Sequence, residues 1–173
     1  MLKIINNILD NETHKELLKI CEDFDNRNFV NVNQERSNYY VRSHIKNEIL
    51  IDYIANAKKY LIKNLSYDKI KIIDFETTDS WINKVSIETN KNDDFHRDSS
   101  DLSIITYLND EFTGGELIYI NEDGIVKTIV PEKNMTLVMN DRLLHKVAPI
   151  SSGIRFSLVT FLKVPQKINK SFI

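Results

Sequence analysis

The apolar pattern of this chain changes near Leu65, and this change constrains the fold more than any other feature. Before it, one helix is expected to begin at Asp10 or Asn11 and a second to span about 46–64. After it, short runs rich in Ile, Val and Tyr are typical of β-strands. The expected strands are 69–77, 81–89, 102–108, 116–120, 125–130, 135–139, 143–148 and 154–164. Helices followed by about eight strands predict an α+β chain, a β-sandwich or jelly roll buttressed by N-terminal helices.

Two segments between these elements have less regular patterns. Residues 25–44 are rich in Asn and aromatic side chains without a clear period, which predicts a loop or an irregular strand. The run Asn121-Glu122-Asp123-Gly124 separates two expected strands and is typical of a hairpin turn, with Gly124 supplying a positive φ.

Length and composition limit the other possibilities. The 173 residues are expected to form one domain, 1–173, with a helical part over about 1–65 and a strand-rich core over about 66–165. The net charge of −2 disfavours nucleic acid as a partner. A single cysteine, Cys21, excludes an intrachain disulfide and fits a reducing compartment. Without an apparent signal peptide or membrane span, a cytoplasmic location is expected.

The spacing of His96 and Asp98 fits one particular metal chemistry. Residues i and i+2 of a β-strand point to the same face, so the two side chains could offer a nitrogen and an oxygen to one ion. A distant histidine on another strand, His145, would complete a set of two histidines and one carboxylate. Such a set leaves three positions open and suits non-haem Fe(II), whereas a structural zinc site uses mostly Cys and His.

Other motifs follow these residues in a fixed order. They are His96-Arg97-Asp98, Thr106-Tyr107-Leu108-Asn109, Thr113-Gly114-Gly115-Glu116, Leu144-His145-Lys146-Val147 and Gly153-Ile154-Arg155-Phe156-Ser157. The ordered set resembles the 2-oxoglutarate- and Fe(II)-dependent dioxygenases, and in particular their prolyl 4-hydroxylase-like branch. The resemblance is strong over about 40% of the chain and implies a double-stranded β-helix (jelly roll) core.

The resemblance also implies roles for individual residues. His96, Asp98 and His145 would be the metal ligands. Arg155 would pair with the distal carboxylate of 2-oxoglutarate, which suits a guanidinium because it can grip a carboxylate through two nitrogens. Tyr107 would donate its hydroxyl to the same carboxylate, and Ser157 would assist from the same strand face as Arg155. No catalytic residue beyond the metal centre is implied.

The implied reaction consumes Fe(II)-bound 2-oxoglutarate and O2, with ascorbate as an added reductant. It would release succinate and CO2 and hydroxylate an unactivated C–H bond of a prolyl or other amino-acid residue in a peptide, protein or free amino acid. The chain departs from the family at two positions, where Ile87 and Asn90 stand in place of a frequent Tyr and Gly. Ile87 cannot form a hydrogen bond there. No feature indicates an oligomeric state.

Rival functions remain open on the sequence alone. One is a catalytically silent jelly-roll binding module that keeps only the fold. Another is an oxygenase acting on a small molecule or on nucleic acid, and a nucleic-acid demethylase would find stacking and basic groups in Tyr39, Tyr40 and Arg42. A cupin-like metal isomerase is a third.

Residues outside the motifs are expected to have ordinary structural roles. His14 and His44 lack the context of a metal site, and His14 is expected to be solvated in the first helical turn. Trp81 is expected in the core. Arg97 lies between the two expected ligand positions and, by strand parity, points away from them, toward substrate or solvent.

Overall fold

The computed structural model describes residues 2–23, 30–32, 36–40, 48–64, 76–89 and 93–163. The described helices are α1 (Asn11–Asp23) and α3 (Glu48–Asn64). The described strands are β1 (Leu2–Asn6), β2 (Val30–Val32), β3 (Arg36–Tyr40), β4 (Glu76–Ser86), β5 (Leu102–Tyr107), β6 (Phe112–Gly114), β7 (Leu117–Ile120), β8 (Val126–Ile129), β9 (Met135–Asn140), β10 (His145–Val147) and β11 (Ile150–Lys163). None of the helices in this part of the chain has the length and apolar character of a membrane-spanning helix.

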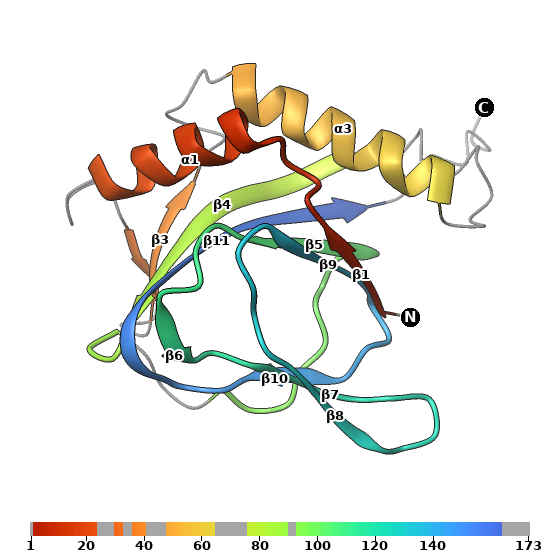
Figure 1. Ribbon diagram of the computed structural model, residues 1–173. Helices are drawn as coiled ribbons and strands as arrows, with labels where there is room; N and C mark the ends of the chain where they lie inside the picture. Colours follow the sequence, from red (N-terminus) through yellow and green to blue (C-terminus); the bar gives the residue numbers. More distant parts are fainter. Residues whose placement is uncertain are drawn as a thin grey trace, which may run out of the picture.

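The strands form a large sheet and a small one. The large sheet has the order β1-β9-β5-β11-β4-β3-β2, with β6 pairing to β11, and the small sheet has the order β10-β7-β8. In Figure 1, α1 and α3 lie across one face of the large sheet and the small sheet lies on its other side. This arrangement confirms the predicted α+β class, a double-stranded β-helix core supported by N-terminal helices.

Helix α1 begins where the sequence indicated. The side-chain oxygen Oδ1 of Asp10 accepts hydrogen bonds from the backbone amides of Glu12 and Thr13, at 3.0 and 2.8 Å, which makes Asp10 the N-cap. The bond from the Thr13 amide is the main reason that the pKa of Asp10 is lowered.

Strand parity on β11 decides which side chains meet the helices. Phe156 and Leu158 pack with Leu17 of α1 and Tyr53 of α3 in one apolar cluster. Arg155 and Ser157 alternate with them and line a cavity on the other face of the sheet. The predicted alternation along this strand is therefore confirmed, and it separates a supporting face from a face that carries polar side chains.

His14 lies in the core, so the expectation that it is solvated was wrong. Its side chain is buried, like those of Leu17 and Cys21, because spacings of three and seven residues place all three on one stripe of α1. Its Nε2 atom has no hydrogen-bond partner among the described residues. Burial, followed by the nearby charge of Lys133, lowers the pKa of His14 from its ordinary value of 6.5.

This lowered pKa predicts acid sensitivity. Below about pH 6.5 the unfolded chain binds a proton on His14 and the folded chain does not, so the free energy of unfolding should decrease as the pH falls. For one proton the slope approaches about 1.4 kcal/mol per pH unit. Urea unfolding between about pH 7.5 and 5.5 should show a shallower slope for His14→Gln than for the wild type. Equal slopes would contradict this role of His14.

Several predicted strands agree with the structure, and the hairpin is confirmed. The Asn121 amide donates to the carbonyl of Ile125, at 3.0 Å, and Gly124 has φ 77°. The part predicted as helical, 1–65, also contains β2 and β3, which fall in the segment 25–44 expected to be a loop or an irregular strand, and β1, which was not predicted. Strand β6 was not predicted either. Most of the predicted strand 69–77 lies outside the described residues.

Candidate active site

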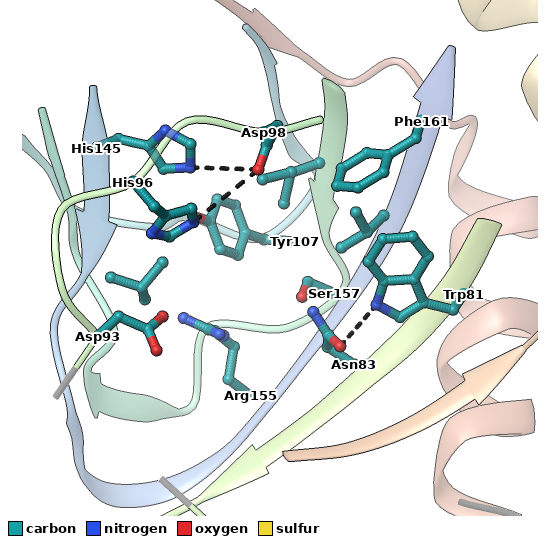
Figure 2. A pocket seen from close by; sticks show the side chains of 13 residues that line it. Trp81, Asn83, Asp93, His96, Asp98, Tyr107, His145, Arg155, Ser157 and Phe161 are labelled. Atoms are coloured by element: carbon teal, nitrogen blue, oxygen red, sulfur yellow. Dashed lines mark hydrogen bonds and ion pairs between the residues drawn. The ribbon is translucent and has the colours of Figure 1, made fainter. Parts of the chain in front are cut away.

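A cavity lies between the two sheets, bounded by the inner faces of β4, β5 and β11 and by β10 (Figure 2). The lining side chains are Trp81, Asn83, Asp93, His96, Asp98, Ile105, Tyr107, His145, Val147, Arg155, Ser157, Val159 and Phe161. All six residues to which the sequence analysis assigned a site role are among them. On β5 and β11, whose opposite faces pack under the helices, strand alternation turns Tyr107, Arg155 and Ser157 toward this space.

His96, Asp98 and His145 lie close enough to share one ion. The Nε2 atoms of His96 and His145 are 4.0 and 3.8 Å from the same oxygen, Oδ1 of Asp98. One donor atom from each of the three side chains lies within 4.8 Å of the other two. The structure thus brings together the three residues that the sequence analysis selected as a possible metal centre.

The local backbone differs from the regular strand expected for His96 and Asp98. His96 forms an isolated antiparallel bridge with His145, in which the His96 amide donates to the His145 carbonyl at 2.8 Å and the reverse bond is 3.0 Å. This bridge, and not a strand through residue 98, holds the two imidazoles side by side with ring centroids 4.6 Å apart. Nε of Arg97 donates to the Arg142 carbonyl, at 3.2 Å, and ties the segment to the turn before β10.

Both imidazoles are held in the tautomer that a metal requires. Nδ1 of His96 lies 2.9 Å from the Asp94 carbonyl, and Nδ1 of His145 lies 3.1 Å from the Leu143 carbonyl. A carbonyl can only accept a hydrogen bond, so each Nδ1 carries the proton and each Nε2 keeps its lone pair. Both lone pairs are available on the side of Asp98.

Burial favours the neutral form of His145. This side chain is 4% exposed, and burial lowers the pKa of His145 despite the opposing influence of the Leu143 carbonyl and the carboxylate of Asp98. A neutral imidazole is the form that coordinates a metal, so protons compete less with an ion at this position.

A serine from β5 orients the carboxylate. The hydroxyl of Ser103 donates to Oδ2 of Asp98, which leaves Oδ1 facing the two imidazoles. Ser103 is itself buried and hydrogen-bonded to Ser100, at 2.8 Å. A nitrogen-oxygen donor set with fixed tautomers and a held carboxylate fits an ion such as Fe(II) that keeps open positions.

Removing this serine should weaken metal binding. We expect Ser103→Ala to raise the dissociation constant for Mn(II) about 10- to 100-fold, because Asp98 loses the donor that orients it. Isothermal titration of the metal-free protein measures the change. Ser100→Ala is the matched control, since it removes a partner of Ser103 but no contact with Asp98. Equal affinities in wild type and Ser103→Ala would contradict the assigned role.

The backbone on both sides of Arg155 is held by hydrogen bonds to one asparagine side chain. Nδ2 of Asn109 donates to the Ile154 carbonyl, at 2.7 Å, and its Oδ1 accepts from the Phe156 amide, at 2.8 Å. Asn109 therefore clamps the backbone on either side of Arg155. The guanidinium donates from NH1 to the Gly115 carbonyl, at 3.3 Å, and the side chain is only 6% exposed.

Gly114 and Gly115 leave room for Arg155 to lie close to the backbone after β6. Gly114 has φ 86°, and a Cβ there would lie 2.0 Å from the Pro149 carbonyl oxygen. Gly115 has φ 72°, and a Cβ there would lie 3.2 Å from NH1 of Arg155. Any larger residue at either position would push β6 away from β11 or crowd the guanidinium.

Tyr107, Ser157 and Asn83 form a row across three neighbouring strands. Ser157 pairs with Tyr107 of β5 on one side and with Asn83 of β4 on the other. Tyr107 and Ser157 are each 2% exposed and line the cavity. Burial raises the pKa of Tyr107, with the charge of Arg155 opposing that effect, so its phenol is a neutral hydrogen-bond donor at pH 7.

Sequence reasoning missed part of the wall. Trp81 was expected in the core, yet it lines the cavity beside Asn83 and Phe161. The alternation Trp81, Asn83 and Val85 along one strand face, with a polar residue in its middle, is the signal that could have identified them. Asp93 also lines the cavity, and its charge raises the pKa of His145 against the larger effect of burial.

Of the two departures from the family pattern, Ile87 lies away from this wall. Ile87 is 62% exposed in the turn after β4 and does not line the cavity. Asn90, Arg42 and His44 lie outside the described residues.

Comparison with known proteins gives one sequence match and many structural ones. The family model described as the 2OG-Fe(II) oxygenase superfamily matches residues 83–163, which include all six predicted site residues. No curated protein matches the sequence significantly.

Solved structures share the fold at low sequence identity. A prolyl hydroxylase from Trichoplax adhaerens, solved with a peptide fragment of the hypoxia inducible factor oxygen degradation domain, is similar with TM-score 0.73 and 18% identity, covering 94% of this chain and 83% of that one. A Pseudomonas putida prolyl-4-hydroxylase has TM-score 0.76 and 16% identity, covering 95% and 93%. HygX from Streptomyces hygroscopicus, solved with nickel, 2-oxoglutarate and hygromycin B, has TM-score 0.66 and 9% identity, covering 94% and 82%.

Proposed function

We propose that this chain, in which residues 83–163 match the family model of the 2OG-Fe(II) oxygenase superfamily, hydroxylates an unactivated C–H bond of a prolyl or other amino-acid residue in a peptide. The reaction would convert 2-oxoglutarate and O2 to succinate and CO2, with ascorbate as an added reductant that keeps the iron reduced. In this proposal His96, Asp98 and His145 hold Fe(II), and Arg155, Tyr107 and Ser157 bind the cosubstrate.

One observation carries the proposal. A three-residue donor set with open positions and a buried guanidinium face the same cavity from different segments of the chain. A structural ion would need only the donor set, and a surface ion pair would need only the arginine. A dicarboxylate that chelates the ion at one end and meets Arg155 at the other accounts for both.

The protein groups would bind and orient the reactants. When bound, Fe(II) with 2-oxoglutarate and O2 supplies the oxidising chemistry that the side chains lack. Arg155 would grip the distal carboxylate through its guanidinium, and the neutral phenol of Tyr107 would donate to the same group. Ser103 and the Leu143 and Asp94 carbonyls would keep the three ligands oriented throughout.

A peptide substrate is supported by fold and family together. Two similar structures are prolyl hydroxylases, one of them with a bound peptide. HygX, which was solved with hygromycin B, represents the alternative of a small-molecule substrate on the same fold. The proposal favours a peptide because these two prolyl hydroxylases have TM-scores of 0.73 and 0.76, against 0.66 for HygX.

The test is turnover and binding on the intact protein. The protein is incubated with Fe(II), 2-oxoglutarate, ascorbate and a panel of proline-containing peptides, and succinate is measured together with a 16 Da gain in peptide mass. Turnover with hygromycin-like aminoglycosides but not with peptides would favour the small-molecule alternative. Lack of Mn(II)-dependent binding of 2-oxoglutarate would refute the proposal and favour a catalytically silent binding module.

A further inference from the structure

The cavity is lined by one further hydrogen-bond donor besides the three residues proposed to bind the cosubstrate. Asn83 lies beside Ser157 in the row across β5, β11 and β4, on the side opposite Tyr107. Its side chain is 5% exposed and lines the cavity. A buried primary amide that lines a cavity needs partners for both its oxygen and its nitrogen.

The orientation of this amide follows from its tryptophan neighbour. Nε1 of Trp81 lies 2.8 Å from Oδ1 of Asn83 (Figure 2). An indole nitrogen can only donate, so it must face the amide oxygen, and the NH2 group is turned the other way, toward the cavity. Within the described part of the chain, no acceptor is hydrogen-bonded to this NH2 group.

Trp81 is itself fixed. Its ring packs edge-to-face on Phe161, with centroids 4.8 Å apart and planes at 84°. Such a contact restrains the indole and therefore the amide that it orients. The donor of Asn83 is pre-organised, so a ligand can bind it without first ordering the side chain.

The groups around Asn83 share the same polarity. The Arg155 guanidinium and the Asn83 amide present N–H donors, and the hydroxyls of Tyr107 and Ser157 can donate as well. Asp93 also lines the cavity, whereas the carboxylate of Asp98 is turned to the imidazoles. A carboxylate offers about four acceptor sites and can accept from several such donors together.

We propose that the Asn83 amide donates a hydrogen bond to the distal carboxylate of 2-oxoglutarate, and that Trp81 positions it. This inference rests on the proposed function, because it adds a binding residue to the same cosubstrate site. It assigns the Trp81-Asn83 pair on β4 to cosubstrate binding and not to substrate recognition.

The test compares two ligands that differ only at the group in question. 2-Oxopentanoate has the same chain as 2-oxoglutarate with a methyl group in place of the distal carboxylate. Both are titrated calorimetrically into the Mn(II)-loaded protein. In Asn83→Asp the acceptor for Trp81 is kept, but the NH2 donor becomes a negative oxygen facing the carboxylate. We expect 2-oxoglutarate to bind about 10- to 100-fold more weakly to this variant and 2-oxopentanoate to bind within about twofold of the wild type.

Further variants keep the test decisive. Asn56→Asp makes the same chemical change at an exposed position of α3 and should leave both affinities unchanged. Trp81→Phe removes the donor that orients the amide, and about a threefold or larger loss for 2-oxoglutarate alone is expected. It tests the inference even if Asn83→Asp does not fold. Because Trp81 is the sole tryptophan, its fluorescence should also report cosubstrate binding in the wild type.

The outcomes separate the inference from the proposed function. If the wild type shows no Mn(II)-dependent binding of 2-oxoglutarate, both fail. If the wild type binds and Asn83→Asp binds equally well, the inference fails and the proposed function stands. Equal weakening of both ligands, or a higher KM for the peptide with unchanged cosubstrate affinity, would also overturn it, since Asn83 would then shape the cavity or contact the substrate.

Discussion

Replacing His145 with alanine should weaken Mn(II) binding by at least about 100-fold, the largest effect that we expect from any single substitution. Loss of a supporting partner already costs 10- to 100-fold in metal affinity, and loss of a ligand costs more. His145 supplies one of three donor atoms that lie within 4.8 Å of one another. Isothermal titration and Mn(II) electron paramagnetic resonance measure the loss directly.

His14→Ala is the matched control for this prediction. His14 is also a buried histidine, but it lies in α1 on the other face of the large sheet. We expect His14→Ala to lower the melting temperature and to keep the wild-type affinity for Mn(II). Wild-type Mn(II) affinity in His145→Ala would rule out the proposed metal centre.

The second large effect is expected at Arg155. Arg155→Met keeps an unbranched apolar stem but removes the guanidinium, and we expect the dissociation constant for 2-oxoglutarate to rise about 100-fold. Truncating one partner of a buried charge pair costs about 2–5 kcal/mol, and 1.4 kcal/mol corresponds to a factor of ten. The dissociation constant for Mn(II) should stay within about twofold, because Arg155 does not touch the three ligands.

Two comparisons make this prediction specific. Arg155→Lys keeps the charge but loses the two-nitrogen grip, so an intermediate loss of about tenfold is expected. 2-Oxopentanoate has no distal carboxylate, and its affinity should change little in either variant. A comparable loss for both ligands would show that Arg155 supports the shape of the cavity and does not bind the carboxylate.

The strands that could be predicted are those whose own sequence shows an alternation or a continuous run of apolar residues. β5, β9 and β11 are rich in branched residues and alternate or bury both faces, and their periods are local properties. β1 was missed because its stability depends on a distant partner, with Leu2 pairing with Met139. Only Ile5 of this strand is buried, so β1 has no apolar alternation of its own to identify it.

The same distinction applies to the site. Arg155 could be identified because its chemistry stands out and its spacing from His145 is local. Asn83 and Trp81 could not, because their residue types are common in core strands and only the pairing of β4 with β11 turns that face toward the cavity. The prediction for His14 was wrong for a different reason. Its polar side chain suggested exposure, but its position on the buried stripe of α1 places it in the core.

The sequence by itself determined the donor atoms, their order along the chain and the alternation that gives each strand an inner and an outer face. Only the tertiary structure decided that His96 and His145 bridge each other, that a backbone carbonyl accepts a hydrogen bond from each Nδ1 atom, and that Ser157 lies between Tyr107 and Asn83. The physical reason is the separation along the chain of the residues that determine each feature. Side-chain chemistry and strand period belong to a few neighbouring residues, whereas the meeting of groups about fifty residues apart depends on how whole strands pair and pack.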